Sequence, residues 1–120
     1  MMPEVVFYKE PHGRAPVLEW LRHLRYTNRA AYAACAAAIL MLALLGHNLR
    51  RPMADLLRDG IYELRITRAS VQYRIRYSFH GGNLALLDHV QTEKEPPPES
   101  GLERALRRKQ AFEADPEAHT

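Results

Sequence analysis

Four arginines that fall within a dozen positions, and one histidine after them, are the residues of this chain that could do chemistry together. They are Arg65, Arg68, Arg74, Arg76 and His89. Side chains alternate between the faces of a strand, so all of these except Arg68 are expected on one face of a sheet. Guanidinium groups bind phosphate through paired hydrogen bonds, and histidine transfers protons near neutral pH. The pattern predicts an RNA site that stabilises growing charge on a phosphate.

A simpler interpretation is that these arginines only solvate an open face of the sheet. Glu63 and Asp88 could pair with them, and exposed ion pairs are common and contribute little to stability. His89 would then be a surface histidine, and His80, beside a glycine turn, is a weaker second candidate for proton transfer. No two histidines have helical metal-ligand spacing with an adjacent carboxylate, so we expect neither a metal nor another cofactor.

The charge of the chain is concentrated in its middle. The 120 residues carry a formal charge of +3, and 47% of them are hydrophobic, which fits one globular domain. Residues 47–91 hold seven arginines and four carboxylates, whereas the segment from residue 92 holds five cations and seven carboxylates. This bias is compatible with a nucleic-acid partner. With a single cysteine, Cys35, and no secretory-signal pattern, we expect a cytoplasmic protein.

Apolar periodicity predicts the elements that would position the arginines. In chain order they are a strand at 3–10, helices at 16–26 and 28–48, and strands at 61–67, 72–79 and 84–91. The order β-α-α-β-β-β describes an α+β fold in which a helix hairpin packs on a small sheet. Simple alternation in the last strand directs Leu84, Leu86 and Val90 toward the helices and His89 away from them.

Two segments of unusual composition complete the chain. Residues 30–45 are uncharged and alanine-rich. The run is short for a membrane-spanning helix and has no cationic face for a membrane surface. We therefore expect a core helix that is buried on nearly all sides. The prolines at 96–98 predict a stiff linker before a final helix at 101–114, whose narrow apolar stripe predicts loose docking. We assign the chain to one domain. Residues 1–95 form its main body, and residues 96–120 are the linker and terminal helix of the same domain.

The chain resembles a known family over roughly residues 5–110. The stretches "LGHNLRRPMADLLRDGIYELRI", "YRIRYSF" and "GGNLALLDHV" are similar to the phage-derived HigB-like toxins of the RelE/ParE superfamily of type II toxin–antitoxin modules. The resemblance implies a RelE-like fold with a largely antiparallel sheet, metal-independent cleavage of mRNA on the ribosome, and a cognate antitoxin expected to carry a helix-turn-helix. The related ParE branch inhibits DNA gyrase on the same fold, so a binding toxin without nuclease activity is the alternative.

The resemblance also assigns roles to individual residues. Arg65 and Arg74 occupy the family's two strand-arginine positions, which implies phosphate binding and charge stabilisation. His89 corresponds to the family's histidine with a displacement of one residue, which implies proton transfer. We assign Arg68, Arg76 and Lys94 to RNA binding.

The sequence departs from the family pattern just after the last strand. Thr92 and Glu93 stand where similar proteins have lysines. Replacing two cations by a neutral and an anionic group beside an RNA path is expected to lower affinity for RNA. The departure therefore favours either a weak nuclease or a different target.

Overall fold

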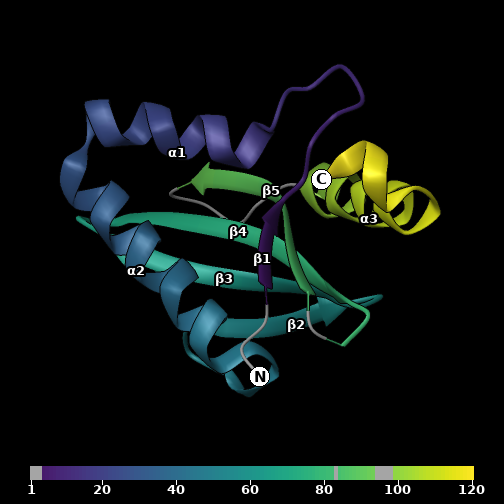
Figure 1. Cartoon of the computed structure of the whole chain (residues 1–120). Helices are drawn as coiled ribbons and strands as arrows, with labels where there is room; N and C mark the ends of the chain where they lie inside the picture. The colour runs from purple at the N-terminus through teal and green to yellow at the C-terminus, as the bar shows by residue number, and fades with distance from the viewer. Residues whose placement is uncertain (1–3, 83, 94–98) are drawn as a thin grey trace.

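The computed structural model describes residues 4–82, 84–93 and 99–120, and within them the chain forms three α-helices and a five-stranded sheet. In chain order the elements are β1 (Glu4–Phe7), α1 (Pro16–Thr27), α2 (Arg29–Leu45), the 3₁₀ turn η1 (Gly46–Asn48), β2 (Ala54–Arg58), β3 (Ile61–Arg68), β4 (Val71–His80), β5 (Leu84–Glu93), α3 (Glu99–Ala114) and the 3₁₀ turn η2 (Pro116–His119). The predicted α+β fold, with a helix hairpin on a small sheet, is confirmed (Figure 1).

The sheet has the order β1-β5-β4-β3-β2 and is antiparallel except where β1 runs parallel to β5. Sequence reasoning missed β2, a strand of five residues at the edge of the sheet. Its polar residues Asp55 and Arg58 hide the alternation that marks a strand. It joins β3 through a tight turn in which Asp59 and Gly60 both have positive φ, 52° and 76°, the conformation that short hairpins require.

The two N-terminal helices cover one face of the sheet (Figure 1). Pro16 occupies the first turn of α1, where its missing N–H costs nothing. Asn28 begins α2 by accepting a hydrogen bond from the Ala31 amide at 3.1 Å, as expected of a helix cap. Val17 and Leu21 of α1 and Leu42 of α2 belong to one buried cluster, together with sheet residues of β3, β4 and β5. This cluster is the main core of the protein.

The alanine-rich helix is less buried than its composition predicts. Ala31, Cys35, Ala38 and Leu42 are buried, but Leu40 on the outer side is 59% exposed. The expectation of burial on nearly all sides is wrong because the sheet and α1 cover only one side of α2. The 20 residues Arg29–Asn48 are long and apolar enough to cross a membrane by length and composition alone. The core helix of a soluble protein passes the same test, and four residues of α2 are buried in the core.

A bulge in β5 changes which of its residues face the helix hairpin. Arg76 pairs with His89 whereas Tyr77 pairs with Leu87, so Asp88 is an extra residue in the ladder. The bulge reverses the alternation, because one added residue moves every following side chain to the other face. Leu87 therefore packs in the main core, whereas Leu86 packs with Phe112 in a second cluster. The prediction that Leu84 and Leu86 face the hairpin is wrong.

Helix α3 covers part of the other face of the sheet. Phe112 is 3% exposed and packs with Val6, Tyr8 and Leu86, and Ala105 is fully buried. The prediction of loose docking is therefore wrong, because two well-spaced apolar residues suffice when the sheet offers a matching apolar strip. The predicted proline linker at 96–98 lies outside the described residues. The docked helix sets which arginines of the sheet reach solvent.

Candidate nucleic-acid interface

Strand register brings the expected polar residues together on the face opposite the helix hairpin. Arg65 pairs with Arg74, Arg74 with Gln91, and Arg76 with His89 across β3, β4 and β5. Because directly paired residues share a face, the expected grouping of Arg65, Arg74, Arg76 and His89 is confirmed. Arg68 pairs with Val71 at the end of the hairpin, where alternation places it on the other face. Arg68 is therefore separate from the cluster, and Lys94 lies outside the described residues.

Glu63 is the centre of this arginine cluster. Its Oε2 lies 3.0 Å from Arg65 Nε, and its Oε1 lies 3.4 Å from the Nε atoms of both Arg74 and Arg76. The Glu63 side chain is only 5% exposed, so its charge requires these partners. One carboxylate balances one of the three guanidinium charges, which leaves this part of the face positive. Sequence reasoning considered Glu63 only as a partner of surface arginines and missed its burial.

Arg65 and Arg74 are the arginines of this cluster that remain accessible. Their side chains are 40% and 15% exposed, whereas that of Arg76 is 2% exposed. Glu63 holds the Nε atom of each, and Arg74 Nη1 is buried without a hydrogen-bond partner among the described residues, so Arg65 is the more accessible of the two. Arg65 Nη2 also lies 3.4 Å from Asp55 Oδ2, and Arg74 Nη2 donates to Gln72 Oε1. The accessible part of this cluster therefore consists of two neighbouring arginine side chains fixed by one buried carboxylate.

The N-terminal part of α3 covers Arg76 and His89, which corrects their expected place on an open face. A β-carbon added at Gly101 would lie 3.1 Å from Arg76 Nη1 and 3.3 Å from His89 Nε2. It would also lie 2.5 Å from Gln91 Oε1, so glycine lets the helix approach the sheet this closely without displacing these three side chains. Arg76 Nη1 donates to Gln91 Oε1 at 3.3 Å beneath the helix. Arg76 is thus a buried structural residue rather than an exposed contact for RNA.

The environment of His89 opposes its protonation. Burial is the largest cause, and the positive charges of Arg108 and Arg76 add to it; together they lower the pKa of His89 to about 4. The imidazole is consequently neutral at pH 7. The expected role in proton transfer at an open surface does not fit this position, since the side chain is 8% exposed beneath α3.

Sequence reasoning missed the burial of Asp88 on this face. Both carboxylate oxygens of Asp88 are buried and have no hydrogen-bond partner among the described residues. Burial raises the pKa of Asp88 well above its usual range, despite the nearby charges of Arg108 and Arg76. Arg108 of α3 donates to the Asp88 carbonyl oxygen at 2.6 Å and lies 3.5 Å from Glu10. The bulge that turns Asp88 inward is not signalled by a glycine or proline, so the sequence gives little warning of it.

The remaining histidines and the cysteine offer little chemistry. His80 shares a hydrogen bond of 2.8 Å with the Ser78 hydroxyl, and burial lowers the pKa of His80. Cys35 is fully buried, and burial raises the pKa of its thiol to about 11. Among the described residues, no group of three or more histidine, cysteine, aspartate or glutamate side chains could hold a metal ion.

These features define a small α+β protein with a helix hairpin on one face of its sheet and a carboxylate-centred arginine cluster on the other. Residues 19–110, more than three quarters of the chain, match the family model described as "Phage derived protein Gp49-like (DUF891)". The chain belongs to this family, whose members are RelE-like toxins of toxin–antitoxin systems. A search of curated proteins found no match.

Proposed function

We propose that this protein is the toxin of a type II toxin–antitoxin module and cleaves mRNA on the ribosome in the cytoplasm. Family membership supports the toxin class. The observation that supports phosphate chemistry is the cross-strand pair of Arg65 and Arg74, two partly exposed guanidiniums fixed by Glu63. Two such groups can bind one phosphate and stabilise the charge that it gains in the transition state.

The proposed reaction needs no metal. The 2′-oxygen of one nucleotide attacks its own 3′-phosphate, the bond from phosphorus to the 5′-oxygen of the next nucleotide breaks, and the products are a 2′,3′-cyclic phosphate and a 5′-hydroxyl. The proton lost by the 2′-hydroxyl equals the proton gained by the 5′-oxygen. With His89 buried and neutral, the protein contributes mainly charge stabilisation and positioning.

A second candidate function is a toxin that binds its target without cleaving RNA, for example a topoisomerase inhibitor. The burial of Arg76 and His89 under α3 favours this alternative, because it removes the expected proton-transfer group from the accessible face. The replacement of the family's lysines by Thr92 and Glu93 points in the same direction.

Two assays separate these functions: growth after induced expression, and primer extension on mRNA bound to purified ribosomes. Both compare the wild type with Arg65→Ala and Arg74→Ala. The nuclease proposal expects growth inhibition and discrete cleavage by the wild type, with both lost in each variant. Arg25→Ala, an exposed arginine of α1, is the matched control. Toxicity that depends on Arg65 without any cleavage would establish the binding toxin instead.

We also propose a cognate antitoxin with a helix-turn-helix, encoded beside the toxin. Family membership points to such a partner. An acidic or amphipathic segment is expected to cover the positive face, because opposite charge promotes association. Co-expression of the neighbouring gene should restore growth and yield a complex that survives gel filtration. Normal growth on strong solo expression of soluble protein would contradict the toxin assignment.

A further inference from the structure

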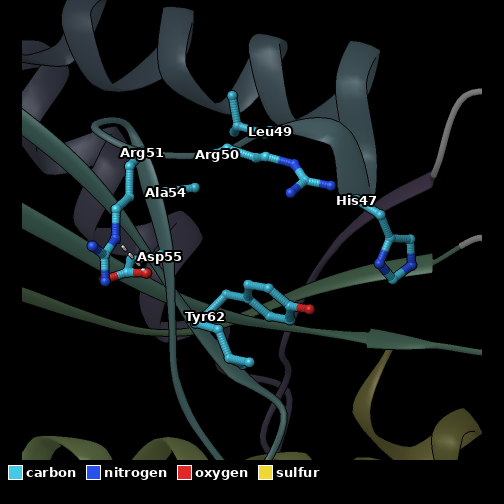
Figure 2. Close-up of a pocket in the computed structure, with 8 residues that line it drawn as sticks. His47, Leu49, Arg50, Arg51, Ala54, Asp55 and Tyr62 are labelled. Carbon is cyan, nitrogen blue, oxygen red and sulfur yellow. Dashed lines mark ion pairs between the residues drawn. The ribbon is translucent and has the colours of Figure 1, made fainter.

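A cleft lies at the edge of the molecule, between the end of α2 and the strands β2 and β3. The segment that follows α2 forms one wall of a cleft of about 490 Å³, and Ala54, Leu56 and Tyr62 form another (Figure 2). Ligand pockets in proteins commonly have volumes of about 300–1,000 Å³, with mostly apolar walls and a few converging polar groups. The volume of this cleft lies in that range, but polar and charged residues make up about half of its lining.

Arg50 supplies the uncompensated charge of the cleft. Arg51 is paired with Asp55, with 3.0 Å between Nε and Oδ1, and the other oxygen of Asp55 lies 3.4 Å from Arg65 Nη2. The exposed Arg50 has no carboxylate partner among the residues that the structure describes. Figure 2 shows its guanidinium extending over Tyr62 toward His47. The cleft therefore carries one net positive charge directed into its open space.

His47 and Tyr62 are held in place by aromatic residues behind them. The His47 ring stacks on Phe79, with 3.7 Å between ring centroids and an interplanar angle of 27°. Tyr62 stacks on Tyr77, with centroids 5.3 Å apart. Aromatic packing of this kind fixes ring orientation and leaves the polar edge free for hydrogen bonding. An imidazole and a phenol therefore border the space into which Arg50 points.

We propose that this cleft binds the phosphate and sugar of a nucleotide. The phosphate accepts charge-assisted hydrogen bonds from Arg50, with His47 and Tyr62 as further polar partners, and the apolar body of the nucleotide rests against Leu49 and Leu56. The chemistry suits a free nucleotide and a nucleotide of single-stranded RNA alike. The cleft lies next to the arginine cluster, because Asp55 in its lining contacts both Arg51 of the cleft and Arg65 of the cluster.

Titration of the purified chain with AMP, adenosine and a short single-stranded RNA tests the proposal without ribosomes. AMP should bind saturably and shift the NMR signals of His47, and adenosine should bind at least about tenfold more weakly, because it lacks the phosphate. Arg50→Ala should weaken AMP binding by about tenfold to a hundredfold. Arg25→Ala, with an exposed arginine removed elsewhere, should leave it unchanged.

The same titrations identify the source of the nucleotide. RNA that binds more tightly than AMP, and loses affinity in both Arg50→Ala and Arg65→Ala, indicates a path from the arginine cluster into the cleft. AMP that binds as tightly as RNA, with no effect of Arg65→Ala, indicates a free nucleotide. Three results would overturn the cleft assignment. They are AMP binding by Arg50→Ala that equals that of the wild type, adenosine binding that equals AMP binding, and the lack of any saturable binding. Each of these results is independent of whether the protein cleaves mRNA.

Discussion

Glu63 and Arg76 lie opposite each other on β3 and β4 and bury their charges together. Glu63 Oε1 lies 3.4 Å from Arg76 Nε, and the two side chains are 5% and 2% exposed. Burial is the largest cause of the lowered pKa of Arg76, and the nearby charge of Arg74 adds to it, whereas Glu63 opposes the shift. The pair is stable only because each partner offsets the desolvation of the other. The arginine cluster therefore belongs to the core of the fold as well as to its surface.

Glu63→Ala is expected to destabilise the protein strongly. The substitution leaves Arg76 buried beside Arg74 without their shared carboxylate, while Arg65 keeps only its longer contact with Asp55. Removing one partner of a buried ion pair costs about 3–5 kcal/mol. Urea denaturation followed by circular dichroism measures the change. Glu103→Ala is the matched control, since Glu103 is exposed on α3 and its removal should change the denaturation midpoint little. Equal midpoints for both variants would contradict the buried role of Glu63.

Arg74→Lys should retain part of the activity that Arg74→Ala loses. Lysine keeps the positive charge but cannot contact Glu63 and a phosphate at once through a planar fork. Removing one group that stabilises transition-state charge typically lowers the rate by about 10²–10³-fold. Single-turnover cleavage on purified ribosomes should rank the wild type above lysine and lysine above alanine. Alanine and lysine variants that both cleave at the wild-type rate would leave Arg74 as a structural residue.

The sequence predicts the face of Arg65 and Arg74 because β3 and β4 are regular along their pairing. The same alternation fails in β5, where the bulge at Asp88 reverses the phase for Leu86 and Leu87. No glycine or proline marks this position, since the bulge follows from pairing with β4 rather than from local conformational preference. His89 lies on the expected face because it follows Asp88 in β5, and the residues whose faces are reversed precede Asp88.

The burial of Arg76 and His89 could not be predicted from local pattern. It depends on the approach of Gly101, which is 25 residues further along the chain than Arg76. The apolar residues of α3 indicate a helix but not the strip of sheet on which it docks. Composition failed similarly for α2, because an uncharged helix is compatible with burial on one side or on all sides. Tertiary contacts decide both cases.

Two neighbouring alanines of α2 test this one-sided burial. Ala38 is 3% exposed, whereas Ala37 is on the exposed side of the same helix turn. Ala38→Asp should unfold the domain, because an unpaired buried charge costs several kcal/mol out of a typical stability of about 5–15 kcal/mol. Ala37→Asp should cost only the difference in helix propensity, about 0.7 kcal/mol. Thermal melting compares the two, and similar melting temperatures would mean that the helix packs differently.

The imidazole of His89 should remain neutral until the solution is strongly acidic. Its folded pKa of about 4 lies below the value of about 6.5 for an unfolded chain. Between these values the unfolded state binds more protons, so the contribution of His89 makes the free energy of unfolding fall as the pH is lowered from about 6.5 to about 4. NMR titration of the ring measures the pKa directly. His89→Gln, which cannot take up a proton, should lose less stability than the wild type over this pH range. A His89 ring that titrates near 6.5 in the folded protein would mean that α3 uncovers it in solution, and would restore proton transfer as its role in cleavage.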